Sequence, residues 1–116
     1  TPIQIDDMAD AKNFFLLIKT QAIAGDDEAI AKSIFYPINV KVNGEGVTVL
    51  SADEFLQNSR QILNDKIIKA LVDNSEDDLV NSFMGIRVGN GELWFNLFCM
   101  DPSCKQKNFQ ITQINN

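Results

Sequence analysis

The stretch from Leu93 to Met100 reads LWFNLFCM, and it constrains the fold more than any other part of the chain. In a strand, successive side chains point to opposite faces of the sheet, and here both sets are largely apolar. One set is Leu93, Phe95, Leu97 and Cys99, and the other is Trp94, Asn96, Phe98 and Met100. We expect one set to pack on helices. The other set then needs a pocket ligand, a partner subunit or both.

Composition limits the classes of partner. The chain has 116 residues, which fits one domain over residues 1–116 with a core of its own. Its 16 acidic and 10 basic residues give a net charge of −6, so we expect no nucleic-acid partner, whereas a basic protein or a neutral ligand fits. With no histidine and two cysteines, we expect no metal site and no cofactor. No apolar run reaches the roughly 18 residues of a membrane span.

The first two thirds of the chain predict mainly helices. Apolar residues recur at spacings of three and four residues, and each stretch starts at a residue that can cap a helix. The SADE sequence at Ser51–Glu54 forms a capping box, in which a hydroxyl and a carboxylate three residues apart satisfy free N–H groups. The expected helices run from Asp6 or Asp7 to Ala24, from Asp26 to the residues before Pro37, from Ser51 through Leu63, and from Asn64 or Asp65 to Val72.

The remaining segments predict strands, because apolar residues alternate with polar ones or form short apolar runs. Asn90-Gly91 is the strongest hairpin signal in the chain. A two-residue turn there would pair Gly89 with Glu92 and Val88 with Leu93, and this pairing sets Arg87 opposite Trp94. The expected strands are Ile38–Val42, Val47–Val49, Leu79–Val88, Glu92–Met100 and Gln106–Ile114.

Four segments together carry a family resemblance. They are FFLLIKTQAIAGDDEAIAKSIFYPINV (Phe14–Val40), SADEF (Ser51–Phe55), NSFMGIRVGNGELWF (Asn81–Phe95) and the ITQIN ending. With them the chain resembles the nuclear transport factor 2-like superfamily, also called SnoaL-like or cystatin-like cone folds, and particularly its small secreted or periplasmic bacterial members of unknown function. The resemblance implies an α+β fold in which N-terminal helices pack in the concavity of a curved antiparallel sheet, forming a cone-shaped barrel. It also implies a homodimer through the sheet.

The segment CMDPSC predicts a disulfide between Cys99 and Cys104, because an Asp-Pro turn lets the two thiols face each other across a hairpin. A disulfide favours a periplasmic or secreted protein. The chain begins with Thr1 and shows no leader, which is compatible with a leader already removed. Two reduced thiols in a cytoplasmic protein are the alternative.

The cone implied by the resemblance holds the candidate ligand pocket, with Tyr36, Phe55, Arg87 and Trp94 as candidates for its wall. We expect a non-catalytic, extracytoplasmic binding module that holds a small apolar ligand or binds a protein, with toxin neutralisation as one use. The alternative is an isomerase or hydrolase of the ketosteroid isomerase or epoxide hydrolase type that uses Tyr36 as an oxyanion donor. Enzymatic members place carboxylates, tyrosines and histidines in the cone. This chain has no histidine and a single tyrosine, so binding is favoured.

Simpler interpretations compete for the same residues. Tyr36 fits an aromatic wedge between a helix and the first strand. Arg87 fits a salt bridge with an acidic neighbour, and Trp94 fits plain core or interface packing. The face that Trp94 occupies separates these interpretations, because a concave position predicts a ligand contact and a convex position predicts a dimer contact.

Overall fold

The computed structural model describes residues 5–82, 85–99, 101–105 and 107–116. Its helices are α1 (Ile5–Ala24), α2 (Asp27–Lys32), α3 (Ala52–Gln57), α4 (Ser59–Ile62), α5 (Asp65–Asp73) and the 3-10 helix η1 (Glu76–Asp78). Its strands are β1 (Ile38–Val42), β2 (Glu45–Val49), β3 (Val80–Ser82), β4 (Gly85–Val88), β5 (Leu93–Cys99) and β6 (Lys107–Ile114). Four residues of the predicted strands lie outside the described residues, namely Phe83, Met84, Met100 and Gln106.

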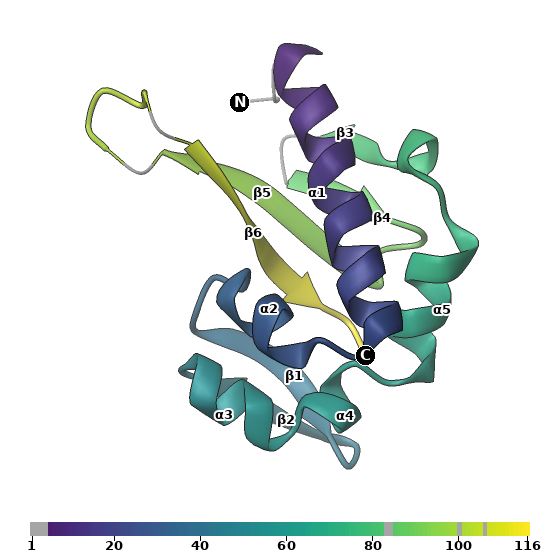
Figure 1. Cartoon of the computed structure of the whole chain (residues 1–116). Coiled ribbons are helices and arrows are strands. Elements are labelled where there is room, and N and C mark those ends of the chain that lie inside the picture. Colours follow the sequence, from purple (N-terminus) through teal and green to yellow (C-terminus); the bar gives the residue numbers. More distant parts are fainter. Residues whose placement is uncertain (1–4, 83–84, 100, 106) are drawn as a thin grey trace.

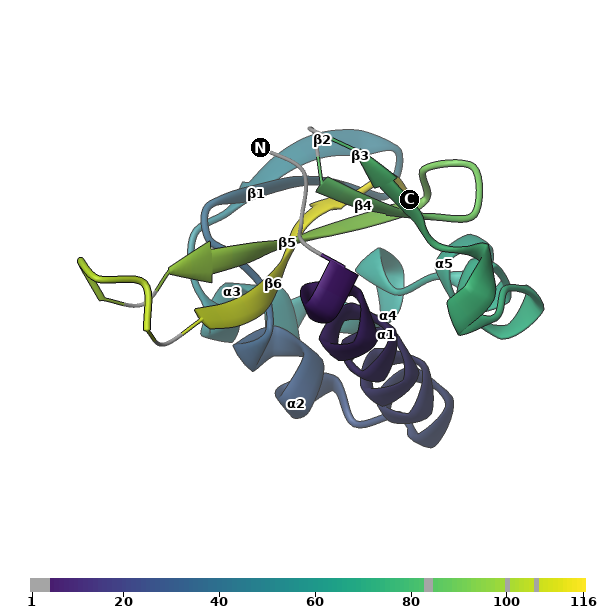
Figure 2. The same ribbon diagram turned by 90° about the horizontal axis from the view of Figure 1, so that it is seen from above.

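The helices lie on one side of the strands, so the fold is α+β as expected (Figures 1 and 2). Strands β3, β4, β5 and β6 form an antiparallel sheet in that order, and β1 and β2 form a separate antiparallel hairpin. The described strands do not close into a barrel, so the cone remains unconfirmed. The β5–β6 hairpin extends beyond the other strands as an arm (Figure 1).

Local capping chemistry explains where the helices begin. The Asp26 side chain accepts from the Ala29 N–H at 3.3 Å and starts α2. Asn64 does the same for Ile67 at 3.2 Å and starts α5. The hydroxyl oxygen of Ser51 accepts from the Glu54 N–H at 3.3 Å and starts α3. Helices were predicted to start near these three residues, and each cap satisfies an N–H that a helix end leaves without a partner. The predicted capping box at Ser51 was wrong in its second half, because Glu54 Oε2 accepts from the Leu50 N–H at 2.8 Å.

Three predicted elements were wrong in extent. The helix expected from Asp26 to the residues before Pro37 ends at Lys32, and Ile34 bridges to Ile111 instead. The helix expected from Ser51 through Leu63 is broken at Asn58, so that α3 and α4 are separate. The strand expected from Leu79 to Val88 is instead the hairpin β3–β4, in which Ser82 pairs with Gly85. Gly85 begins β4 with a φ of +122°, a conformation that side chains with a Cβ rarely adopt, so glycine is favoured at this position.

The core lies between the helices and the strands. Helix α1 contributes a buried stripe at three- and four-residue spacing, made of Ala11, Phe15, Ile18 and Ala22. Phe14 places its ring centroid 5.0 Å from that of Phe95 and 5.5 Å from that of Phe109. Each fully buried phenylalanine contributes up to about 3 kcal/mol through removal of apolar surface from water. Aromatic side chains therefore fill the space between α1 and the sheet.

Candidate functional site

The side of the β3–β6 sheet away from α1 is called the outer face below. Strand register and burial assign its residues, because buried Ile86, Val88, Leu93 and Phe95 point towards the helices and their neighbours point away. Arg87 is the only charged residue among the outer-face positions. These positions are Val80, Ser82, Arg87, Trp94, Asn96, Phe98, Asn108, Gln110 and Gln113.

Arg87 and Trp94 lie opposite each other in the centre of this face. Val80 pairs with Arg87, Arg87 pairs with Trp94, and Trp94 pairs with Gln113, so the four residues form one row across the sheet. Both Arg87 and Trp94 are partly exposed. The Arg87 Nε is buried and has no hydrogen-bond partner among the described residues. A buried donor without a partner costs free energy, so the Arg87 Nε is an unsatisfied group within this row.

An aromatic contact lies further along β5 on the same face, beyond the pair of Asn96 and Gln110. The rings of Phe35 and Phe98 stack with centroids 4.7 Å apart and planes inclined by 3°. Phe35 keeps 45% of its surface exposed and follows Ile34, which bridges to Ile111 on β6. The outer face therefore combines three aromatic side chains, several amides and one arginine, the residue types that are enriched where proteins bind each other.

Tyr36 lies outside the sheet, in the link between α2 and β1. Its hydroxyl donates to the backbone oxygen of Ala31 at 2.7 Å. Burial raises the pKa of Tyr36 to about 12, because the phenolate would lose solvation. This geometry matches the wedge interpretation, in which the hydroxyl is satisfied by backbone.

Phe55 is fully buried on α3 and contributes to the core. It offers no surface to a ligand in this conformation. Of the four candidate pocket residues, Arg87 and Trp94 are paired on adjacent strands, whereas Tyr36 lies in the link after α2 and Phe55 lies in the core.

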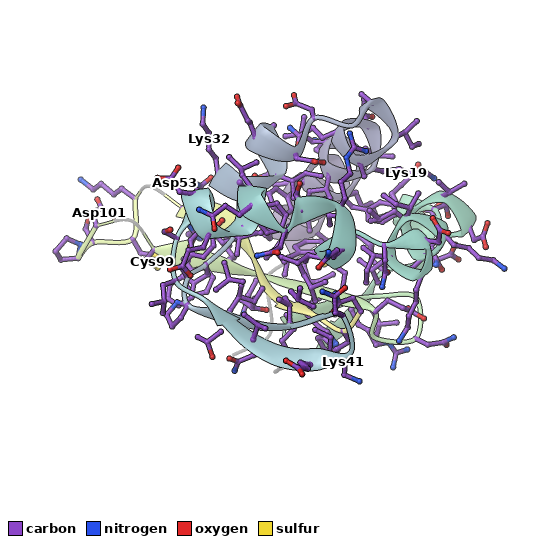
Figure 3. The ribbon with its side chains drawn as sticks, turned by 90° about the horizontal axis from the view of Figure 1, so that it is seen from below. Lys19, Lys32, Lys41, Asp53, Cys99 and Asp101 are labelled. Carbon is purple, nitrogen blue, oxygen red and sulfur yellow. A yellow bond between two sulfur atoms is a disulfide. The ribbon has the colours of Figure 1, made fainter. Side chains whose placement is uncertain are left out.

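The predicted disulfide is present between Cys99 and Cys104, whose Cα atoms are 4.7 Å apart. The turn between them is held by Asp101, whose backbone oxygen accepts from the Cys104 N–H at 3.0 Å and whose Oδ1 accepts from the Lys105 N–H at 2.9 Å. Figure 3 shows Cys99 and Asp101 at the end of the β5–β6 arm. The disulfide closes the tip of the hairpin.

Open hollows lie at the edges of the fold. One of about 420 Å³ lies between the end of α1, α4 and α5, with Ile23, Ile68 and Val72 in its mainly apolar wall. Another of about 350 Å³ lies where β1, the end of β6 and the start of α5 meet.

Within the described ranges, no group of three or more Cys, Asp or Glu side chains could hold a metal ion. No helix in the described part of the chain is both long and apolar enough to cross a membrane.

Sequence reasoning missed the contacts that join distant segments. Asn116 is the main example, because its side-chain Oδ1 accepts from the Lys41 N–H at 2.9 Å and its Nδ2 donates to the Lys41 oxygen at 2.7 Å. The side chain thus pairs with the edge of β1 as a neighbouring strand would. A polar residue after the last strand is too common to reveal this role in advance.

Comparison of the chain with known proteins found no match. No protein-family model matches the chain, no curated protein matches it, and no solved structure matches it.

Proposed function

We propose that the protein is a non-catalytic binding module that works outside the cytoplasm and uses the outer face of its sheet to bind a second copy of itself. The observation that carries this proposal is the pair of Arg87 and Trp94, both partly exposed and opposite each other on a face without carboxylates at its defined positions. In a homodimer, amide oxygens such as those of Asn96 or Gln110 from the second copy would lie opposite this row.

Charge favours a second copy over a basic protein on this face. The chain has a net charge of −6, yet the outer face carries no carboxylate at its defined positions. A basic partner would find no counter-charge there, whereas two copies could approach without repulsion between acidic groups. The carboxylates of the helical side remain exposed in such a dimer, and a basic protein, including a toxin, would bind there.

The packing of the interior favours surface binding over a ligand in a cone. Phe14, Phe95 and Phe109 contact one another between α1 and the sheet. Membership of the nuclear transport factor 2-like superfamily remains our proposal, supported by the sequence segments and by helices layered on an antiparallel sheet. The disulfide supports a periplasmic or secreted location, where thiols are oxidised.

Tyr36 supports binding rather than the isomerase or hydrolase alternative. Its hydroxyl is engaged by the Ala31 oxygen, and its raised pKa of about 12 moves it further from the range of an effective general acid or base near neutral pH.

The test is a mass measurement by light scattering and sedimentation at micromolar concentration. We expect twice the 13.0 kDa of one chain. Val80→Glu and Phe98→Glu place a charge on the outer face and should each weaken the dimer by about tenfold or more, equivalent to 1.4 kcal/mol. Circular dichroism would verify that each variant is folded.

Leu17→Glu is the matched control, because Leu17 is 52% exposed on α1 and Val80 is 40% exposed on β3. The control should remain dimeric. A monomeric mass for the unmodified protein, or equal weakening by all three changes, would contradict the proposal.

A further inference from the structure

A hollow opens where the two sheets separate. The link after α2 bridges to β6 at Ile34 and Ile111, and β1 is joined to the end of the chain again at Lys41 and Asn116. The open hollow of about 350 Å³ lies at this second junction. Its lining is Asn39, Val40, Lys41, Gly46, Lys66, Ile114, Asn115 and Asn116.

Hydrogen bonds to backbone atoms hold the polar wall in place. Besides its two bonds to Lys41, Asn116 donates from Nδ2 to the Gln61 oxygen at 3.3 Å, and its backbone oxygen accepts from Asn64 Nδ2 at 3.2 Å. Asn115 donates from its backbone N–H to the Glu92 oxygen at 2.8 Å. The wall is therefore fixed by contacts with several elements, which lowers the entropy lost when a ligand binds.

The charges around the hollow are positive in an acidic protein. Lys41 and Lys66 line it, and no Asp or Glu side chain is among its lining residues. The ion pairs seen among the described residues are Lys12–Asp77 and Arg60–Asp27, and neither involves these two lysines. Lys66 also lies in the first turn of α5, where a positive charge opposes the helix dipole. Helix stability therefore does not explain this lysine.

A carboxylate to consider is that of Glu92, which lies outside the lining of this hollow. Glu92 lines the two neighbouring hollows together with Lys66, and its Oε2 accepts from the Asn90 N–H at 2.8 Å. Asn39 adds a donor to the site, because its Oδ1 accepts from the Thr48 hydroxyl at 2.7 Å and its exposed amide nitrogen can donate to a ligand.

We propose that this hollow binds an oxyanion, a carboxylate or phosphate group carried by a small polar molecule of about the size of a monosaccharide. The anion would lie between the Lys41 and Lys66 ammonium groups, and amides would contact the polar body of the ligand. This site is separate from the outer face and goes beyond the dimer proposal.

The experiment is an NMR titration of the full chain with glucuronate, inorganic phosphate and glucose. Glucuronate should shift the amide signals of Lys41, Lys66 and Asn116, and glucose should not. Shifts from phosphate at equal strength would assign the site to the bare anion, and stronger shifts from glucuronate would assign it to the anion on a sugar. Absence of shifts from both anions at about 1 mM and above would overturn the proposal.

Single substitutions locate the site. Lys41→Gln and Lys66→Gln should each weaken the binding of the stronger anion by about fivefold and reduce its salt dependence. Lys32→Gln is the control, since Lys32 is exposed at the end of α2 and projects on the side of the molecule opposite Lys41 (Figure 3). Equal weakening by the control, or unchanged binding by both test variants, would show that the anion is attracted only by general surface charge.

Discussion

The two sides of this molecule differ in how they treat apolar and charged residues. On the helical side, exposed apolar residues such as Leu17 and Ile23 are scattered among charges, and α5 alone carries two acidic and two basic residues. On the outer face of the sheet, Trp94 lies opposite Arg87, Phe98 lies further along β5, and no carboxylate is among the defined positions. Isolated exposed apolar residues are normal for a surface in water, whereas a concentration of aromatics with few charges is typical of an interface.

The largest contrast is expected within one strand, between neighbours that point to opposite sides. Phe95 is fully buried among Phe14 and Phe109, so Phe95→Ala should lower the free energy of unfolding by about 3–5 kcal/mol. Trp94 is partly exposed, so Trp94→Ala should cost the monomer less than about 2 kcal/mol and mainly weaken the dimer. Urea unfolding followed by circular dichroism measures both. Equal losses would mean that Trp94 belongs to the core.

We expect the disulfide to stabilise the β5–β6 arm, whereas the helices and the remaining strands should fold without it. Replacing Cys99 and Cys104 by serine should lower the free energy of unfolding by about 2 kcal/mol, because the closed loop is short. The helical circular dichroism signal should be retained at room temperature. Loss of that signal would show that the arm is needed for the two layers to assemble.

Two hydrogen bonds between the Asn116 side chain and the Lys41 backbone join the β1–β2 hairpin to the end of the chain. Asn116→Ala removes two hydrogen bonds to the Lys41 backbone and should destabilise the protein by about 1 kcal/mol, since both groups can bond to water instead. Hydrogen exchange should accelerate at the Lys41 amide. Asn13→Ala on the exposed surface of α1 is the control and should cause no loss.

The smallest effect concerns the link between helices and strands, where Tyr36 lies. Its pKa is raised to about 12 from an ordinary value of 10.0, so the buried neutral phenol favours the folded state. This contribution is complete below pH 10 and is lost as the pH rises towards 12, because the unfolded chain releases its proton first. Tyr36 is the single tyrosine, so phenolate absorbance reports it alone. A native midpoint near that of the urea-unfolded chain would refute the burial.

Sequence reasoning succeeded where the structure follows from a few adjacent residues. The caps at Asp26, Ser51 and Asn64 act over three residues, and the Asp-Pro turn brings Cys99 and Cys104 together within one hairpin. Such contacts need no knowledge of the remaining fold.

It failed where the outcome depends on packing between distant segments. Apolar alternation from Leu79 to Val88 does not reveal the hairpin in which Ser82 pairs with Gly85, because a glycine in a strand also fits a bulge. The face that Trp94 takes is decided by Phe95, which fits between Phe14 on α1 and Phe109 on β6. No local pattern encodes that contact. The hollow with Lys41 and Lys66 likewise needs three segments that are remote in sequence.

The most direct test of the central claim is the quenching of Trp94 fluorescence by acrylamide at protein concentrations from nanomolar to high micromolar. Trp94 is the single tryptophan, so the signal reports the centre of the outer face alone. We predict that the indole becomes protected as the concentration rises, in parallel with the dimer mass, that Val80→Glu stays quenchable, and that Leu17→Glu behaves as the unmodified protein. Protection that is the same at all concentrations, or a dimer that forms while Trp94 stays equally quenchable, would contradict the account.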